Sequence, residues 1–199
     1  NNPCGVASAN TIKNAYLKAV QSDPVSAFGG VVLLNKKIDN SLSKLITQNF
    51  YEVVVSPKFN KTSLETLKSK KKLIIIDSKN LKEKNKITFK SVRSGILYQE
   101  SNNYKVLKSK IDLVTPKKSS KKTIDDLLFA FKVAKHVKSN SIVLANNKQT
   151  IGIGAGQMSR LDSTRLAISK YKDFFNNRKF VCASDAFFPF VDNIRLLLK

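Results

Sequence analysis

The 199-residue sequence has little sulfur and almost no histidine, and these shortages exclude several kinds of site. It contains two cysteines and one histidine, too few for a disulfide-stapled scaffold or a structural zinc site. No apolar run approaches the roughly 20 residues that span a bilayer, and the N-terminus has no basic segment followed by an apolar one. We therefore expect neither a membrane protein nor a secreted precursor, and the cysteine usage fits a reducing cytoplasm.

Acidic residues are scarce, and so is arginine. The sequence has 36 Lys and Arg residues against 14 Asp and Glu residues, which gives a formal net charge of +22. Such a charge is typical of proteins that bind nucleic acid or an anionic membrane. Only five of the basic residues are arginines, whose fork geometry is preferred for bidentate contacts to phosphates and bases. We attribute the joint abundance of Lys, Asn, Ile and Ser first to codon usage in an AT-rich genome, with a binding surface as the alternative.

Hydrophobic periodicity predicts helices that alternate with strands along the chain, which indicates an α/β architecture. The first helix is expected to begin behind a cap at Asn10. Helices are predicted at 11–21, 38–50, 62–70, 125–139 and 159–172, and strands at 29–35, 52–57, 72–77, 141–146, 149–156 and 179–185, with 91–101 and 102–110 as a strand pair.

The lysine-rich stretch 116–126 is the clearest interruption of this pattern. We place a boundary there and predict two similar α/β lobes, residues 1–118 and 119–199. The chain begins at Asn1 rather than at a methionine and ends within an apparent amphipathic helix, IRLLLK, so we expect a fragment of a longer protein.

The glycine-rich segment 152–157 invites comparison with a dinucleotide-binding loop. The G-x-G-x-x-G pattern requires glycine where this chain has Gln157, and no acidic residue follows a strand about 20 positions later. A glycine turn before a helix can still approach an anion or ligand. A ligand-contacting turn and a purely structural one both stay open.

The histidine and the cysteines give no catalytic pattern. His136 falls on a predicted helix where a structural role suffices, and Cys4 and Cys182 would need the single histidine as their base. We expect none of the three to be catalytic.

Aromatic residues and a carboxylate follow the last predicted strand, in SDAFFPFVDN at 184–193. Ligands bind at strand ends in α/β sheets, aromatic rings there can hold a flat heterocycle, and Asp192 could accept two N–H bonds from a 2-amino-4-oxo edge. This segment is our candidate ligand site. Asn140, between a helix and a strand, is either a cap or turn residue or a side chain that recognises a carboxamide.

Taken together, five segments resemble the AICAR transformylase domain of the bifunctional purine biosynthesis proteins. They are NNPCGVASAN at 1–10, SDPVSAFGG at 22–30, HVKSNSIV at 136–143, QTIGIGAGQMSRLDSTR at 149–165 and ASDAFFPFVDN at 183–193. The resemblance covers essentially the whole chain in the right order. The departures are Asn146-Asn147-Lys148, where a Gly-containing turn is common, and Arg93-Ser94, where a Gly pair is usual.

The resemblance implies formyl transfer from 10-formyltetrahydrofolate, a diffusible cosubstrate, to the 5-amine of AICAR, giving FAICAR in IMP biosynthesis. It implies two lobes of cytidine-deaminase-like fold with three α/β/α layers, a homodimer with active sites at its interface, and a parent enzyme that also carries IMP cyclohydrolase. No bound cofactor or metal is implied.

The resemblance places the family's proton acceptor outside the printed sequence. In the family a Lys-His pair directly before the x-N-P-C-G segment accepts the proton and stabilises the transition state. That segment starts here at Asn1, so the pair is expected upstream of Asn1 and is absent from residues 1–199. We therefore expect these residues alone to be inactive.

The family's substrate positions can be carried over motif by motif. Asn140 matches the asparagine that holds the substrate carboxamide and is the one catalytic position in this chain. Gly29, Glu52, Arg160 and Phe187 match nucleotide-contacting positions.

The resemblance also assigns the folate side of the site. Leu161 and Val25 match apolar folate contacts, Pro189 and Phe190 match residues that pack on the pteridine, and Asp192 matches the residue that pairs with its edge.

A basic nucleic-acid-binding module is the alternative from a different class. It predicts aromatic residues interleaved with Arg or Lys on strand platforms. Here the aromatics cluster in SDAFFPF and the lysines are spread throughout, so we expect no nucleic-acid partner.

Overall fold

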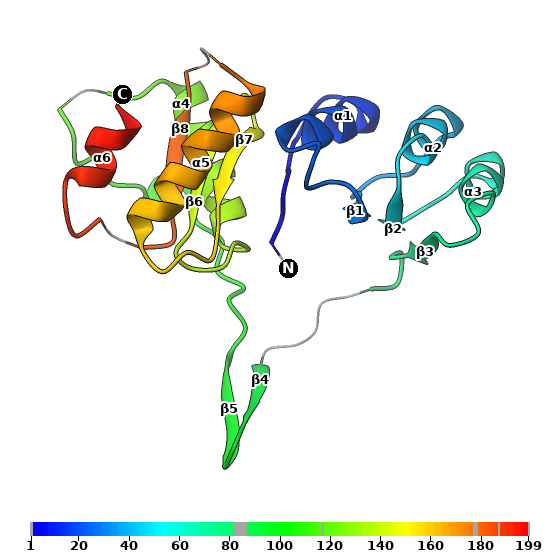
Figure 1. Ribbon diagram of the computed structural model, residues 1–199, viewed down its shortest axis with the longest axis horizontal. Coiled ribbons are helices and arrows are strands. Elements are labelled where there is room, and N and C mark those ends of the chain that lie inside the picture. Colours follow the sequence, from blue (N-terminus) through cyan, green and yellow to red (C-terminus); the bar gives the residue numbers. More distant parts are fainter. Residues whose placement is uncertain (1, 82–86, 117, 177–178, 187, 199) are drawn as a thin grey trace.

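The protein is described by a computed structural model that covers residues 2–81, 87–116, 118–176, 179–186 and 188–198. Two α/β lobes lie side by side, and a hairpin projects away from both (Figure 1). The predicted α/β class is confirmed. Within these ranges no helix is long and apolar enough to cross a membrane.

The first lobe is a three-stranded parallel sheet with its helices on one face. Each helix begins at a side chain that accepts a backbone N–H three residues on, namely Thr11, Asp39 and Asn60. The expected cap at Asn10 is therefore wrong by one residue, because the Thr11 hydroxyl takes that place. The elements are α1 (Ile12–Ser22), β1 (Gly30–Leu33), α2 (Asn40–Thr47), β2 (Tyr51–Ser56), α3 (Lys61–Lys68) and β3 (Ile74–Asp77).

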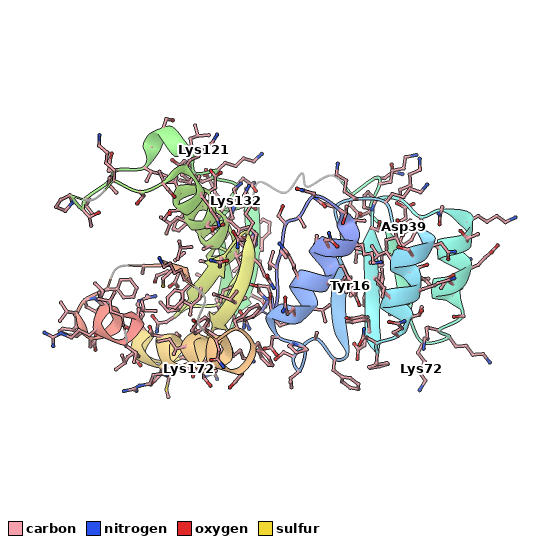
Figure 2. All side chains as sticks on the ribbon, turned by 90° about the horizontal axis from the view of Figure 1, so that it is seen from above. Tyr16, Asp39, Lys72, Lys121, Lys132 and Lys172 are labelled. Carbon is pink, nitrogen blue, oxygen red and sulfur yellow. The ribbon has the colours of Figure 1, made fainter. Side chains whose placement is uncertain are left out.

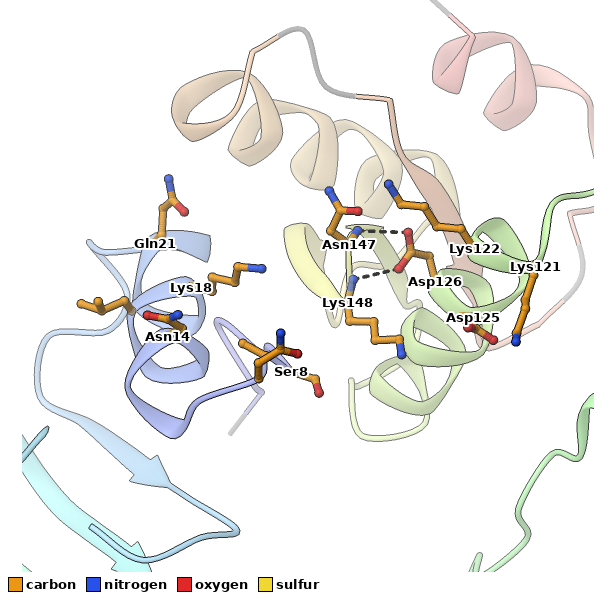
Figure 3. Close-up of a pocket in the computed structure, with 13 residues that line it drawn as sticks. Ser8, Asn14, Lys18, Gln21, Lys121, Lys122, Asp125, Asp126, Asn147 and Lys148 are labelled. Carbon is orange, nitrogen blue, oxygen red and sulfur yellow. Dashed lines mark hydrogen bonds between the residues drawn. The ribbon is translucent and has the colours of Figure 1, made fainter. Parts of the chain in front are cut away.

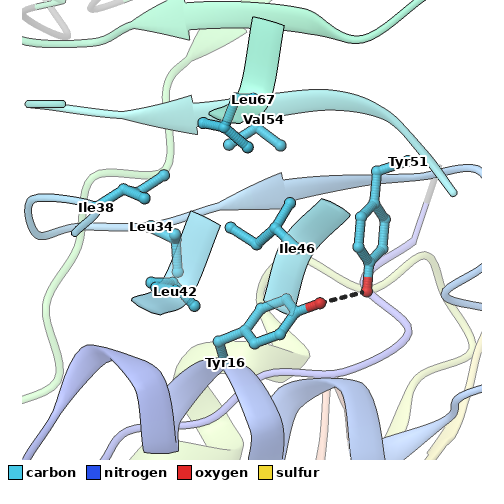
Figure 4. Close-up of a cluster of buried hydrophobic side chains, with 8 residues drawn as sticks. All are labelled: Tyr16, Leu34, Ile38, Leu42, Ile46, Tyr51, Val54 and Leu67. Atoms are coloured by element: carbon cyan, nitrogen blue, oxygen red, sulfur yellow. Dashed lines mark hydrogen bonds between the residues drawn. The ribbon is translucent and has the colours of Figure 1, made fainter. Parts of the chain in front are cut away.

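The core of the first lobe lies between this sheet and its helices (Figure 4). Leu42, Ile46 and Leu67 from the helices are fully buried around Val54 of β2. At its edge the hydroxyls of Tyr16 and Tyr51 are 3.0 Å apart.

The opposite face of the same sheet is uncovered in the described residues. The register aligns Val31 with Val53 and Val53 with Ile74. Val31 and Ile74 are 64% and 57% exposed, and Leu33 on the same face is 73% exposed. The expected three layers are therefore not present in this lobe, where helices cover one face only.

The second lobe has the expected three layers. Its antiparallel sheet has the order β7-β6-β8. Val143 and Ile153 face α4, whereas Leu144 and Ile151 pack against α5 on the other side. The elements are α4 (Lys121–Ala134), β6 (Ile142–Asn146), β7 (Gln149–Gly154), α5 (Arg160–Phe174), β8 (Val181–Ser184) and α6 (Asp192–Leu197).

The hairpin corrects one prediction. Strands β4 (Ile87–Val92) and β5 (Gly95–Glu100) pair with each other around Arg93 and Ser94. Residues 102–110 form no strand and end in a short 3₁₀ turn. The predicted partner strand is wrong because a two-residue turn closes the hairpin inside the segment 91–101, which was expected to be one strand.

The two lobes lie next to each other when seen from above (Figure 2), and contacts between residues far apart in the sequence join them. Val6 pairs with Thr150 through backbone and side chain, which adds the N-terminal segment to the edge of β7. The Ser22 hydroxyl donates to the carbonyl oxygen of Thr150 at 2.6 Å, and Lys170 of α5 forms an ion pair with Asp23.

The glycines of β7 have a packing role. A Cβ on Gly152 would lie 2.2 Å from the carbonyl oxygen of Ala167, and one on Gly154 would lie 1.8 Å from that of Ser163. Only glycine allows the backbone of α5 to approach the sheet this closely. This favours the structural reading of Gly152 and Gly154, while Gly156 supplies a left-handed turn with φ of +67°.

We predict that Gly154→Ala lowers the free energy of unfolding by about 3 kcal/mol, because α5 must move away from β7 to admit the methyl group. Urea titration of the purified chain measures it. Gly95→Ala is the matched control, since a Cβ there meets nothing within 4 Å, and its effect should stay within about 0.5 kcal/mol. Equal losses in the two variants would contradict the packing role.

Candidate functional site

Three loops of the second lobe meet at the N-terminal end of α5. They connect α4 to β6, β7 to α5, and β8 to α6. Hydrogen bonds join all three: Asn140 binds the segment before α5, and Arg160 binds the end of β8. This convergence brings together several of the positions that the sequence singled out.

Asn140 holds the loop before α5. Its side-chain amide donates to the carbonyl oxygens of Gln157 at 2.9 Å and Met158 at 3.1 Å, and its own backbone carbonyl accepts from Ser163 Oγ at 2.7 Å. No described residue donates to its Oδ1. Asn140 therefore has a structural role, and one side-chain acceptor is left for a ligand.

Arg160 is held by a carboxylate that sequence reasoning did not assign. Its Nη1 donates to Asp185 Oδ1 and to Ser184 Oγ, each at 2.6 Å, and the Arg160 and Asp185 side chains are 10% and 16% exposed. The signal available in the sequence was a carboxylate directly at the end of a predicted strand. Arg160 keeps Nε and Nη2 without a hydrogen bond among the described residues.

Asp185 also reaches the loop that carries Asn140. It accepts from the Ser139 hydroxyl and, at 3.0 Å, from the backbone N–H of Ser141. Burial alone would raise the pKa of Asp185, but the hydrogen bonds from Ser139, Arg160 and Ser141 outweigh it and lower the pKa to about 2. The carboxylate is therefore ionised at neutral pH.

The expected folate residues lie on the same side of the lobe. Leu161 is in the first turn of α5, and Asp192 begins α6. The Oδ1 of Asp192 accepts hydrogen bonds from the backbone N–H and from the side-chain amide of Asn193. Pro189 and Phe190 are exposed in the loop before α6.

Two positions of the expected site lie outside the described residues. One is Phe187, the expected nucleotide contact in the loop after β8. The other is Asn1, before which the family's Lys-His pair is expected. The structure therefore tests neither the contact of Phe187 nor the position of the pair relative to Asn1, and both stay predictions.

Asn193 fixes α6 to α5. It is 3% exposed and accepts a hydrogen bond from Thr164 Oγ1 at 2.8 Å. The buried pair sets the position of the neighbouring Asp192, whose Oδ2 has no partner among the described residues.

The expected positions in the first lobe are separate from this cluster. Gly29 has φ of +68° at the start of β1, Val25 is 75% exposed in the loop after α1, and Glu52 is exposed on β2. Where the structure describes the chain, no hydrogen bond or ion pair connects them with Asn140 or Arg160. One chain thus presents two separate groups of expected site residues.

A cavity of about 900 Å³ lies elsewhere, between α1, α4 and the β6–β7 turn (Figure 3). Asp126 there accepts the backbone N–H groups of Asn147 and Lys148, both of which have positive φ. The carboxylate explains how this turn forms without glycine. None of the expected site residues lines the cavity.

The thiols are poorly suited to nucleophilic chemistry. Burial, together with the nearby Asp23 carboxylate, raises the pKa of Cys4, and burial raises that of Cys182 to about 12. His136 is exposed just after α4. Among the described residues no cluster of three His, Cys, Asp or Glu could hold a metal ion.

The chain matches one family and many relatives. Residues 1–170 match the family described as AICARFT/IMPCHase bienzyme. The chain is 44% identical over 200 residues to the bifunctional purine biosynthesis protein PurH of Aquifex aeolicus, covering 100% of this chain and 39% of that protein. The protein of the same name from Fusobacterium nucleatum is 44% identical over 197 residues, with 99% and 38% covered, and that from Buchnera aphidicola is 42% identical, with 97% and 38% covered. The chain thus spans about two fifths of the length of these curated relatives, and none of these matches supports the nucleic-acid alternative.

The pKa of Asp185 predicts a pH dependence of stability. Its folded-state pKa of about 2 lies below the ordinary 3.8, so the ionised carboxylate stabilises the fold above about pH 4 and this contribution is lost as the pH falls toward 2. Wild type should be more stable than Asp185→Asn at pH 6, and the difference should shrink between about pH 4 and pH 2. Urea titrations at pH 6, 4 and 3 test this, and a constant difference would contradict it.

Proposed function

Because the chain belongs to the AICARFT/IMPCHase bienzyme family, we propose that it provides much of an AICAR transformylase site in purine biosynthesis. The reaction moves the formyl group of 10-formyltetrahydrofolate to the 5-amine of AICAR, in the cytoplasm, in a protein whose other activity is IMP cyclohydrolase. The observation that carries the proposal is the convergence of Asn140, Arg160 and the start of α6 around the first turns of α5.

Orientation of the amine is the first chemical requirement. The AICAR amine is a poor nucleophile because its lone pair is delocalised toward the neighbouring carboxamide, so its geometry and deprotonation must be controlled. Asn140 can orient the substrate because its own amide group is fixed by Gln157 and Met158. Its open Oδ1 can then accept an N–H of the substrate carboxamide.

Proton removal and oxyanion stabilisation complete the step. The amine nitrogen attacks the formyl carbon and the amine proton passes to a base. The tetrahedral oxyanion then collapses as the bond between the formyl carbon and the folate nitrogen breaks, and that nitrogen takes up a proton, which releases tetrahydrofolate. We assign these two roles to the family's Lys-His pair, upstream of Asn1. Asn2 supports the assignment, because its Oδ1 accepts the N–H of Lys138 at 2.7 Å, so residues preceding it in a longer chain would enter beside Asn140.

The folate side uses the loop between β8 and α6. Pro189 and Phe190 offer exposed apolar surface next to Asp192, as packing on a flat pteridine requires. Asp192 Oδ2, which has no partner in the described part of the chain, can accept from the pteridine edge. Leu161, in the first turn of α5, contributes an apolar contact in this proposal, and Phe187 a contact to the nucleotide.

A homodimer accounts for the separation between the two groups of site residues. Val25, Gly29 and Glu52 belong to the first lobe and have no described bond to the cluster around Arg160. We assign them to the site that is completed by a second copy, so that each active site combines the first lobe of one chain with the second lobe of its partner. Residues 1–118 and 119–199 stay our proposed lobes.

Asn140→Asp tests the function itself. In the complete protein, formyl transfer is followed as tetrahydrofolate release with AICAR and 10-formyltetrahydrofolate. The variant places a carboxylate oxygen against two backbone carbonyls and leaves the substrate misoriented, so kcat should fall by about 100-fold or more.

Asn146→Asp is the matched control, because the Asn146 amide also donates to a backbone carbonyl, that of Lys179. Both variants should melt at a lower temperature, whereas only Asn140→Asp should lose turnover in the folded enzyme. Absence of formyl transfer in the wild-type protein would refute the function, and equal turnover in the two variants would leave Asn140 with its structural role alone.

Asp192→Asn tests the folate side. Asn193 can still donate to the amide oxygen, so the start of α6 is retained, but an N–H then faces a ligand donor. We expect folate affinity to fall by about 30-fold, which is roughly 2 kcal/mol, with AICAR affinity nearly unchanged. Calorimetry measures both, with Asp39→Asn as control because Asn caps a helix equally well. Unchanged folate affinity would remove Asp192 from the site.

A further inference from the structure

Asp185, which the resemblance did not assign, is bonded both to the loop that carries Asn140 and to the start of α5. Within the described chain its two carboxylate oxygens accept from Arg160 Nη1, from the Ser139 hydroxyl and from the Ser141 N–H. These donors flank Asn140 on one loop and begin α5 on the other side. One side chain thus fixes Asn140 and Arg160, two of the residues proposed to contact AICAR.

The geometry points to Asp185 as the positioning residue for AICAR: it holds the Arg160 guanidinium and the Asn140 loop in the arrangement that binds the nucleotide. The inference rests on the proposed function. Asp185 is placed here as a residue that acts through Arg160 and Asn140, with no contact of its own to substrate.

The contact to Arg160 restricts one edge of the guanidinium. Nη1 is shared between Asp185 Oδ1 and Ser184 Oγ, both at 2.6 Å, with the carbonyl oxygen of Ser141 at 3.4 Å. A charged, short hydrogen bond of this kind orients the planar group. The remaining N–H groups of Arg160 then point in a fixed direction toward a ligand.

The contacts to Ser139 and Ser141 act on the Asn140 loop. Asp185 binds the residue before and the residue after Asn140. The Asn140 amide is tied in turn to Gln157 and Met158. Asn140 is therefore held by two sets of contacts, those of its neighbours with Asp185 and those of its own amide with Gln157 and Met158. Loss of the Asp185 carboxylate removes only the first set.

A positioning role can be distinguished from a purely structural role, because a positioning residue affects the recognition of only one of the two substrates. The residues proposed for folate are Val25, Leu161 and the segment 189–192, and none of them has a described bond to Asp185. Loss of the carboxylate should therefore weaken AICAR recognition and leave folate recognition intact. General destabilisation would instead lower the amount of active enzyme and leave both affinities unchanged.

Asp185→Asn in the complete protein is the decisive variant. We expect the Kd for AICAR, measured by calorimetry, to rise about 10-fold, and kcat/KM for AICAR to fall by about 30-fold or more, with the KM for 10-formyltetrahydrofolate within about twofold of wild type. Asp126→Asn is the matched control, since Asp126 is a buried carboxylate that accepts two backbone N–H groups far from these loops. Its AICAR affinity should equal that of wild type.

A double-mutant cycle with Arg160→Lys adds a second readout. If Asp185 acts through Arg160, then Asp185→Asn should cost much less AICAR affinity in the Arg160→Lys background than in wild type. Additive losses would overturn the proposed route, and so would an AICAR Kd in Asp185→Asn that matches the Asp126→Asn control.

Ser139→Ala keeps the inference testable if Asp185→Asn does not fold. It removes one exposed hydroxyl donor from Asp185 and should raise the AICAR Kd about threefold with folate affinity unchanged. An unaltered AICAR Kd would refute the inference. Wild-type protein that binds AICAR without transferring formyl would refute the reaction alone, whereas wild-type protein that does not bind AICAR would refute both.

Discussion

Helix α5 lies so close to strand β7 that no side chain fits between them at two positions. The carbonyl oxygens of Ser163 and Ala167 occupy the space that a Cβ on Gly154 or Gly152 would need. This contact sets the distance between α5 and the sheet. The proposed site depends on it, because three residues near the start of the helix each hold a different segment. Arg160 binds Asp185 after β8, Ser163 binds Asn140 before β6, and Thr164 binds Asn193 of α6.

The few acidic residues of this very basic chain are used at specific places. Asp39 caps a helix, Asp126 satisfies the backbone of a tight turn without glycine, Asp23 pairs with Lys170 across the lobes, and Asp185 ties the loops of the site together. Exposed ion pairs would add little to stability. These carboxylates matter because each accepts hydrogen bonds at a point where the backbone changes direction, and Asp23, Asp126 and Asp185 each accept more than one.

Local sequence was enough to identify most elements and to select the segments proposed for the site. Periodicity located the helices and most strands, and the aromatics before Asp192 marked the loop after β8. These features are local: the burial of one face, a capping side chain or a turn can be read over a few residues. The same local reading failed at the hairpin, where a two-residue turn interrupts a segment of uniform β-propensity.

Which distant groups meet could be learned only from the tertiary structure. Val6 pairs with Thr150, 144 positions away, and nothing near either residue marks the other as its partner. In the sequence, Asp185 is a polar residue at the end of a predicted strand. Its contacts with Arg160 and with the Asn140 loop are seen only in the fold. From the sequence, the glycines of β7 could belong either to a ligand-binding loop or to a purely structural turn. The position of the α5 backbone favours the structural role for Gly152 and Gly154, because it leaves no room for a Cβ at either residue. A local pattern states what a residue can do, whereas the packing of surfaces far apart in the chain determines what it contacts.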